Sequence, residues 1–243
     1  MVEGAKVLGE AIAAGAVVEA VYAGPDADRS EACVAVLEQA VAIGIRVFAL
    51  REGVLERVSD TVSPQPLVGV VARLDVPLDE VLGKDPIVVC ADVRDPGNLG
   101  AIIRSADAAG AGAVVLSAGT GDLYNPKVVR ASAGSLFHLP VVLGGEILPC
   151  LDALGRAGYR RYGTTASGGE DYATTSYPSS VALVLGNEAA GLSDALLEHC
   201  DAMLSIPIAG GAESLNVAMA GTVLLFELAR RRRVGPGLGP SMT

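Results

Sequence analysis

The stretch LVLGNEAAGLS, Leu183 to Ser193, joins the end of an apolar run to a turn that carries a glutamate between two glycines. An uninterrupted apolar run such as Val181–Gly186 is typical of a strand in a parallel sheet that is buried on both faces. Glu188 then lies just past the carboxyl end of that strand, the edge at which open α/β sheets bind ligands. We therefore expect Glu188 to belong to a functional site. The alternative is that Glu188 only caps a helix that begins near Ser193.

Apolar runs of the same kind recur around this stretch and predict a parallel sheet. Further strands are expected at PIVVCADV (86–93), Ala113–Ser117, His138–Val142, Tyr159–Thr164 and Ala202–Pro207. Helices are expected between them: one begins at Asn125-Pro126, with proline at its first position, and the last spans Leu215–Arg233. Helical spacing predicts the apolar face of that last helix as Leu215, Ala218, Met219, Thr222, Leu225 and Phe226. The second part of the chain is thus predicted to be a parallel-sheet α/β domain.

The first 73 residues show their own alternation of helical and strand patterns. Helices are expected over Glu3–Ala14, from a capping Ser30 to Gly44, and over residues 52–60, and strands are expected from Val17, Ile45 and Leu67. This order predicts a small α/β/α domain. Proline, glycine and charge interrupt the rhythm at residues 75–85. We therefore divide the chain into an N-terminal domain (1–73), a linker (74–84), a C-terminal domain (85–234) and a flexible tail (235–243).

The composition limits the classes of function. Hydrophobic residues make up 51% of the 243 residues, which is enough for a large core. No apolar run reaches the roughly 18 residues of a membrane span, and the N-terminus lacks the pattern of a signal peptide. We expect a cytoplasmic protein that does not contact a membrane. The four widely spaced cysteines are expected to be reduced thiols, and no cluster of cysteine, histidine and carboxylate side chains predicts a metal site.

The charge distribution bears on nucleic-acid binding. A net charge of −10 argues against a protein that coats nucleic acid, although it allows an enzyme that contacts nucleic acid locally. Residues 1–83 carry 6 Lys+Arg and 13 Asp+Glu, whereas residues 84–243 carry 12 and 15. Basic residues cluster at Arg160-Arg161 and at Arg230–Arg233. The second cluster either contacts a partner or is a solvated helix end, where the helix dipole favours cations.

A second motif, DPGNLGAIIRSADAAG (Asp95–Gly110), follows the first strand of the C-terminal domain. Asn98 is expected to cap the helix there, and Gly97 and Gly100 are expected to permit close approach of the backbone. Arg104 is expected on the second turn of that helix among small and apolar residues. This setting favours a clamp for phosphate or carboxylate over a solvated arginine. The fingerprint G-x-G-x-x-G is absent, which disfavours a dinucleotide-dependent oxidoreductase.

A third motif, SIPIAGGAESLNVAMAG (Ser205–Gly221), runs from a strand through a glycine-rich loop into the last helix. Ser214 is expected to be the N-cap of that helix, and Asn216 offers amide donors and acceptors in its first turn. A neutral loop that exposes backbone groups suits an adenine or a ribose. No lysine follows the glycines, which argues against an NTPase.

These three motifs, in this order and spacing, resemble those of the SpoU (TrmH) family in the SPOUT class of methyltransferases. The resemblance covers nearly all of residues 84–233. Residues 1–73 resemble the ribosomal-protein-like substrate-binding domain that often precedes it, chiefly through VEGAKVLGEA and PLVGVVA. The resemblance implies a deep trefoil knot, S-adenosyl-L-methionine as co-substrate and no metal. It also implies methylation of a ribose 2′-hydroxyl in RNA by a homodimer whose active sites draw on both subunits.

The resemblance also assigns roles to individual residues. The catalytic set, near the methyl group and the ribose, is expected to be Asn98, Arg104, Glu188, Ser214 and Asn216. Contacts with the cofactor are expected from Thr164, Leu185, Gly186, Ile206 and Leu215. Contacts with RNA are expected from Arg104, Arg130 and Ser132.

Methyl transfer to a 2′-hydroxyl requires that the hydroxyl lose its proton. Arg104 has the position of a general base, but a guanidinium is not deprotonated in proteins. We therefore expect Arg104 to clamp the adjacent phosphate, while Ser132 or Ser214 relays the proton. Ribosomal RNA is the expected substrate because of the leading domain. The alternatives are transfer RNA as substrate and a non-catalytic module that binds RNA or the ribosome.

Overall fold

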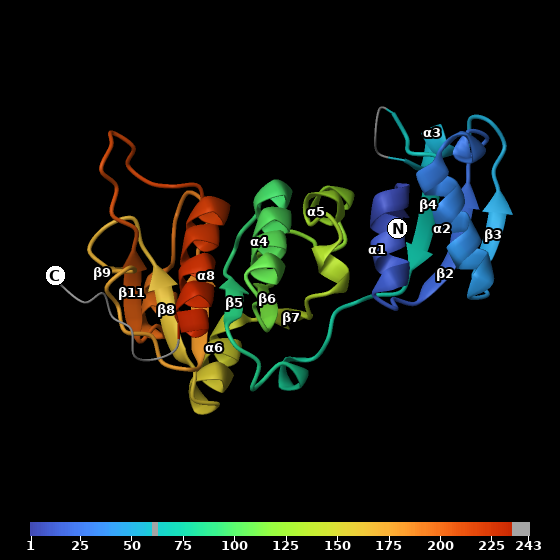
Figure 1. Ribbon diagram of the computed structural model, residues 1–243. Helices are drawn as coiled ribbons and strands as arrows, with labels where there is room; N and C mark the ends of the chain where they lie inside the picture. The colour runs from blue at the N-terminus through green and yellow to red at the C-terminus, as the bar shows by residue number, and fades with distance from the viewer. Residues whose placement is uncertain (60–62, 235–243) are drawn as a thin grey trace.

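The computed structural model describes residues 1–59 and 63–234 and contains two α/β domains joined by an extended segment (Figure 1). The N-terminal domain has a four-stranded sheet in the order β1-β4-β2-β3. Its elements are β1 (Val2–Glu3), α1 (Ala5–Ala13), β2 (Val18–Ala23), α2 (Glu31–Ala42), β3 (Arg46–Ala49), α3 (Leu55–Val58) and β4 (Leu67–Val71). As predicted, Ser30 caps α2, because its hydroxyl accepts the N–H of Cys33 at 3.4 Å.

The C-terminal domain is built on a seven-stranded sheet in the order β7-β6-β5-β10-β8-β11-β9, and every pairing in it is parallel. Its strands are β5 (Ile87–Cys90), β6 (Ala113–Ser117), β7 (Val141–Gly145), β8 (Arg160–Thr164), β9 (Glu170–Asp171), β10 (Val181–Leu185) and β11 (Ala202–Ser205). Its helices are α4 (Pro96–Ala108), α5 (Pro126–Ala131), α6 (Ile147–Arg156), α7 (Asp194–Glu198) and α8 (Val217–Val234).

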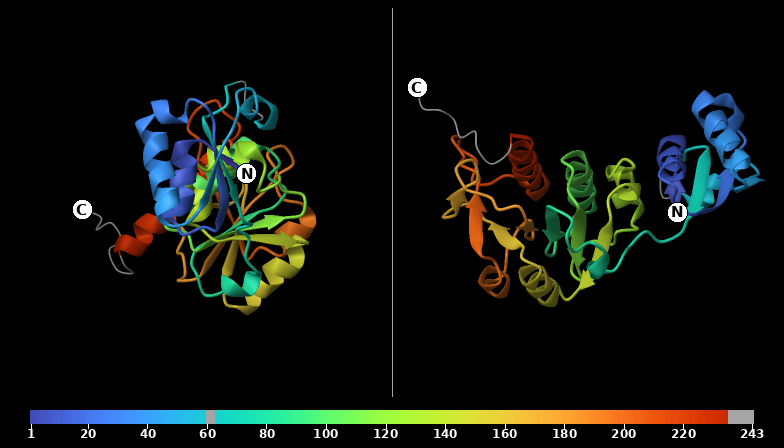
Figure 2. Two further views of the ribbon diagram at one scale, coloured as in Figure 1. Left: turned by 90° about the vertical axis from the view of Figure 1, so that its right-hand side faces the viewer. Right: turned by 60° about the horizontal axis from the view of Figure 1, so that its bottom comes forward.

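Helices cover both faces of the seven-stranded sheet, so the apolar strands are buried on both sides (Figures 1 and 2). Along β10, Leu183 and Leu185 point into the core beneath α4, α5 and α8. The alternate residues Ala182 and Val184 point into a second core beneath α6 and α7. This alternation follows from the two-residue period of a strand. It explains why β10 has no polar residue and could be recognised from its sequence.

Two predicted boundaries near α5 and the third motif were wrong. The strand expected at His138–Val142 is β7, Val141–Gly145. Residues Ser135–Phe137 form a 3-10 turn, and the strand therefore begins only after Pro140. The last helix begins at Val217 rather than at Leu215.

The start of α4 also differs from the prediction. Asp95, not Asn98, is the N-cap, because its Oδ1 accepts the N–H of Asn98 at 2.8 Å. Asn98 lies inside the first turn, which leaves its side chain free for other contacts. Because α4 begins at Pro96, Arg104 lies on the third turn of the helix instead of the second.

Residues 74–84 are attached to the C-terminal domain by hydrogen bonds. The hydroxyl of Tyr124 accepts the N–H groups of Leu74 and Asp75 at 2.8 and 3.0 Å. The hydroxyl of Tyr159 likewise accepts the N–H of Gly83 at 2.8 Å. A direct contact between domains comes from the His138 ring and the Glu10 carboxylate, whose Nε2 and Oε2 are 3.1 Å apart.

No helix in residues 1–59 and 63–234 is long and apolar enough to cross a membrane. The predicted flexible tail, 235–243, lies outside the described residues.

Candidate active site

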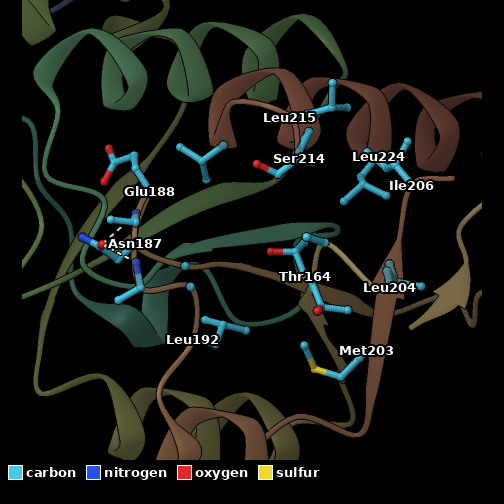
Figure 3. Close-up of a pocket in the computed structure, with 18 of the residues that line it drawn as sticks. Thr164, Asn187, Glu188, Leu192, Met203, Leu204, Ile206, Ser214, Leu215 and Leu224 are labelled. Atoms are coloured by element: carbon cyan, nitrogen blue, oxygen red, sulfur yellow. Dashed lines mark hydrogen bonds between the residues drawn. The ribbon is translucent and has the colours of Figure 1, made fainter. Parts of the chain in front are cut away.

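A cavity of about 410 Å³ opens at the carboxyl ends of β8, β10 and β11, beside the start of α8 (Figure 3). This is the edge of a parallel sheet at which ligands are expected to bind, and its size lies in the range of small-molecule sites. Polar groups from Thr164, Asn187, Glu188 and Ser214 meet apolar walls there. The apolar lining includes Leu192, Met203, Leu204, Ile206, Leu215 and Leu224.

The loop after β10 forms one wall of the cavity and is held by its own backbone. Asn187 and Gly191 exchange two backbone hydrogen bonds of 3.0 and 2.9 Å. The side-chain Oδ1 of Asn187 accepts the N–H groups of Ala189 and Ala190, both at 3.0 Å. Its Nδ2 donates to the carbonyl of Asp92 at 2.9 Å. The loop is therefore closed by contacts within the chain itself.

The contact between the two ends of this loop explains why residue 186 is a glycine. A Cβ at Gly186 would lie 2.6 Å from the carbonyl carbon of Gly191 and 2.8 Å from the nitrogen of Leu192. Real Cβ atoms essentially never come so close to backbone atoms. Glycine is required there so that the two ends of the loop can touch. Gly186 also lines the cavity, and its contact with the cofactor stays a prediction.

Glu188 joins the second motif to the first. Its carboxylate accepts the N–H groups of Arg94 and Asp95 at 3.3 and 3.1 Å, and the side-chain Nδ2 of Asn98 at 3.0 Å. The alternative that Glu188 caps α7 is not supported by these partners. Partial burial acts to raise the pKa of Glu188, but the hydrogen bonds from Asn98 and the backbone outweigh it and hold that pKa below its ordinary value. Glu188 is therefore ionised at neutral pH.

Asn98 extends this chain of hydrogen bonds to the third motif. Its Oδ1 accepts the side-chain Nδ2 of Asn216 at 2.9 Å. The Oδ1 of Asn216 in turn accepts the N–H groups of Ala218 and Met219 at 2.9 and 3.3 Å. Asn216, not Ser214, is thus the N-terminal cap of α8. The three motifs meet through Glu188, Asn98 and Asn216.

Other predicted cofactor and proton-relay residues separate into those that reach the cavity and those that do not. Thr164, Gly186, Ile206, Ser214 and Leu215 line it. Leu185, expected to contact the cofactor, is fully buried beneath α8 and is not part of the lining.

The predicted RNA contacts are also divided. Arg104 and Arg130 are exposed on α4 and α5, and neither lines the cavity. Ser132 has no exposed surface, and its hydroxyl donates to the carbonyl of Val129 at 2.9 Å. The placement of Ser132 does not support a role in contacting RNA or relaying a proton. The close packing of α4 against α5 beside Ser132 requires a glycine at position 100, because a Cβ there would lie 2.5 Å from that of Ala131.

Asp92 is a site residue that sequence reasoning missed. It adopts a φ of 60°, which is uncommon for a residue with a side chain. The hydroxyl of Ser117 holds it by accepting its N–H at 2.9 Å and donating to its Oδ1 at 2.8 Å. This conformation aims the Asp92 carbonyl at Asn187. No local sequence signal marks it, because Ser117 comes from the neighbouring strand.

The arginine run at the end of α8 is largely tied to this chain. Arg230 and Arg231 both bind the carboxylate of Glu227, at 2.8 and 2.6 Å. Arg232 pairs with Asp85 at 2.5 Å and donates to its carbonyl. Arg232, together with a hydrogen bond from Arg231 to the carbonyl of Ala173, fastens the end of α8 to the domain, whereas the pairs with Glu227 lie within the helix.

The cavity has the chemistry of a nucleoside site. Apolar side chains can cover an adenine, and the exposed backbone of the two loops offers donors and acceptors to its edge. The hydroxyls of Thr164 and Ser214 can meet polar groups of a sugar or amino-acid tail. The described residues contain no group of three side chains suited to hold a metal ion. These features fit an adenosyl cofactor such as S-adenosyl-L-methionine.

Comparisons with known proteins agree with this site. Residues 85–226 match the model of the SpoU rRNA Methylase family, and residues 1–69 match the MRM3-like substrate binding domain. A Bacillus subtilis protein, 23S rRNA (guanosine(2553)-2′-O)-methyltransferase RlmP, is 41% identical over 76% of this chain and 73% of its own length.

Two solved structures extend the likeness to the whole fold. The SpoU methyltransferase AviRb of Streptomyces viridochromogenes, in complex with the cofactor AdoMet, has a TM-score of 0.85 and 32% identity, covering 97% of this chain and 91% of that one. An AdoMet-bound rRNA methyltransferase of Sinorhizobium meliloti has a TM-score of 0.81 and 34% identity, covering 95% and 86%.

Fold and site together define an S-adenosyl-L-methionine-dependent RNA methyltransferase of the SPOUT class, with a small substrate-binding domain before a parallel-sheet α/β domain. The chain belongs to the SpoU rRNA methylase family. The fold class, the co-substrate and the enzyme class predicted from the three motifs are confirmed.

Proposed function

We propose that this protein methylates the 2′-hydroxyl of a ribose in ribosomal RNA. The observation that carries the proposal is the hydrogen-bonded junction of Glu188, Asn98 and Asn216 at a nucleoside-sized cavity. The names of its relatives support the substrate. RlmP of Bacillus subtilis and RlmB of Xanthomonas axonopodis, 36% identical over 80% of this chain, are both called 23S rRNA 2′-O-methyltransferases.

The residues of this chain divide the work of the reaction. S-adenosyl-L-methionine supplies the methyl group when bound, and the loop after β10 together with Ile206 and Leu215 would hold its adenosyl part. Arg104 binds the phosphate next to the target ribose, because a guanidinium presents two parallel donors to a phosphate and does not act as a base. Of the two serines expected to relay the proton, Ser214 lines the cavity and Ser132 does not. Ser214 is therefore the relay in this proposal.

Glu188, Asn98 and Asn216 position these groups rather than react. The polar side-chain atoms of each form hydrogen bonds with backbone groups or with another of these three residues. They lock the cofactor loop, α4 and α8 in one arrangement, and such orientation supplies much of the rate in a transfer reaction.

A homodimer completes the proposed site. Arg104 is exposed and does not line the cavity of its own chain. Met219 and Phe226 of α8 are 63% and 43% exposed although both are large and apolar. A second copy that packs on α8 would cover them and would bring its own arginine to the cavity.

We infer that the protein works in the cytoplasm, as the proposed ribosomal RNA substrate suggests. The four cysteines support this location, because all of them are unpaired.

The test of the substrate is methyl transfer from labelled S-adenosyl-L-methionine to purified ribosomal and transfer RNA, followed by mapping of the 2′-O-methyl group. We expect label in ribosomal RNA at one ribose. Label in transfer RNA alone would replace the substrate. RNA binding without any transfer, with S-adenosyl-L-methionine bound or unbound, would favour the non-catalytic module.

A further inference from the structure

The cations of the C-terminal domain fall into two groups. One group is engaged within the chain: Arg160 with the ring of Tyr162, Arg161 with Asp201, Arg230 and Arg231 with Glu227, Arg232 with Asp85, and Arg233 with the carbonyl of Ala229. The other group has exposed side chains that make no ion pair, hydrogen bond or ring contact in the described part of the chain: Arg94, Arg104, Lys127, Arg130 and Arg156. Only the second group is available to a partner without breaking existing contacts.

Four of these available cations lie on neighbouring elements. Arg94 stands just before α4, Arg104 is on α4, and Lys127 and Arg130 are on α5. The two helices touch closely, since a Cβ at Gly100 would lie 2.8 Å from the carbonyl oxygen of Val128. Gly100 and Arg104 are four residues apart and share a face of α4, so Arg104 lies on the side of α4 that meets α5.

The backbone of Arg94 is hydrogen-bonded to the cofactor loop on one side and lies close to the loop that precedes α5 on the other. Its N–H donates to Glu188, which fixes it beside the cofactor loop. Its carbonyl oxygen would lie 3.1 Å from a Cβ at Gly121, in the loop that leads to α5, and Gly121 donates its N–H to Val93 at 3.0 Å. The backbone contacts therefore fix the Cα of Arg94 between the cavity and α5, and the Arg94 side chain extends from that fixed point.

We propose that Arg94 and Lys127 extend the contacts expected of Arg104 and Arg130 into a phosphate-binding track for RNA, running from Arg94 along α4 and across α5. The track rests on the proposed RNA substrate. Beyond α5 the chain reaches His138, which contacts Glu10 of the N-terminal domain. The track thus leads toward the substrate-binding domain, whose residues 1–73 carry 6 Lys+Arg and 10 Asp+Glu. It would supply the local positive charge that a chain of net charge −10 needs to hold a polyanion.

The fifth available cation provides a matched control. Arg156 is exposed and without an ion pair, but it belongs to α6, which packs on the opposite face of the sheet. Arg156→Ala removes the same charge from the same domain away from the track. A non-specific effect of net charge would be equal in the Arg94 and Arg156 variants.

The experiment measures binding of full-length protein to a ribosomal RNA fragment at several salt concentrations, together with single-turnover methyl transfer. We expect Arg94→Ala and Lys127→Ala each to weaken RNA binding about three- to tenfold and to reduce the slope of log affinity against log salt by roughly 0.7–0.9, as for one lost phosphate contact. Affinity for S-adenosyl-L-methionine should not change. Arg156→Ala should bind RNA like the wild type.

The track is overturned if Arg94→Ala and Lys127→Ala keep the wild-type salt slope or lose no more affinity than Arg156→Ala. The proposed enzymatic function fails separately, through absence of methyl transfer by the wild type, and the binding measurement does not depend on that transfer. Unfolding curves of the three variants should coincide, since none of these side chains is buried or paired.

Discussion

Asn216 performs two tasks with two different atoms. Its Oδ1 caps α8, whereas its Nδ2 bonds to Oδ1 of Asn98. Asn98 cannot turn its amide round to compensate, because its own Nδ2 is engaged by Glu188. The structural and the positioning roles of Asn216 can therefore be separated by substitution.

We predict that Asn216→Asp keeps the helix cap but breaks the bond to Asn98. The melting temperature should stay within about 2 °C of the wild type, because aspartate is as good an N-cap as asparagine. Methyl transfer should fall by roughly tenfold or more, because the hydrogen bond to Asn98 is lost and a new carboxylate faces the Oδ1 of Asn98. Asn216→Ala should lower both quantities. An aspartate variant that is as active as the wild type would show that the junction does not matter for the reaction.

Gly186 and Gly210 offer a second contrast between single residues near the cavity. A Cβ at Gly186 collides with the backbone of Gly191, whereas nothing lies within 4 Å of a Cβ at Gly210. We predict that Gly186→Ala lowers the free energy of unfolding by about 1–3 kcal/mol and weakens S-adenosyl-L-methionine binding. Gly210→Ala should change neither. Denaturant unfolding and calorimetric titration measure the two effects, and equal behaviour of both variants would contradict the closed loop.

At the scale of elements, the arginines at the end of α8 are held in part by the carboxylate of Glu227. Hydrogen bonds from Arg230 and Arg231 lower the pKa of Glu227 to about 2, against the opposing effect of partial burial. A carboxyl group whose pKa is lower in the folded state than in the unfolded state stabilises the fold at pH values above its unfolded-state pKa. This stabilisation is lost as the pH falls toward the folded-state pKa. The contribution of Glu227 should thus be complete above about pH 4.5 and fade between there and about pH 2.

We predict that Glu227→Gln lowers the melting temperature of the C-terminal domain by roughly 2–4 °C at pH 7. The difference from the wild type should shrink as the pH falls below about 4.5. Glu198→Gln, on the exposed face of α7, serves as the control and should change little. Calorimetric scans between pH 7 and pH 3 make the comparison. A difference that grows at low pH would be opposite in sign to this account.

At the scale of the whole molecule, the exposed apolar side of α8 is the feature that a single chain leaves unexplained. We predict that the wild type is a dimer of 24.6 kDa chains at micromolar concentration. Met219→Lys and Phe226→Lys should each shift the mass measured by light scattering toward one chain and reduce methyl transfer. Their folding should be intact, because both side chains are exposed within one chain. Val41→Lys, at an equally exposed apolar residue of α2, should leave the dimer intact.

If light scattering gave the mass of one chain for the wild type under active conditions, the proposal that each active site uses residues of both chains would be wrong. That result would also require Arg104 to act from the surface of its own chain. Measuring mass and activity on the same samples distinguishes this outcome from a simple loss of fold.

The sequence determined those features that depend on local patterns. The strand Ala113–Ser117 was predicted with the bounds that the structure has, because a strand buried on both faces must be apolar throughout. Ser30 was recognised as a cap because its serine precedes a helical pattern. The three motifs led to the cofactor and the class of reaction only through their resemblance to those of a known family, which their order and spacing along the chain were enough to show.

Only the tertiary structure decided which partners those residues meet. Helical spacing groups the apolar residues of α8 but does not say which way the sheet lies: Leu224 and Leu228 are buried, whereas the predicted Met219 and Phe226 are exposed. Either Ser214 or Asn216 can cap a helix, and the choice followed from where the backbone first turns helical. The junction of Glu188 with Asn98 and Asn216 joins residues 90 and 118 positions apart along the chain. A parallel sheet brings strand ends together at one edge regardless of sequence separation, and that long-range geometry is what no local pattern contains.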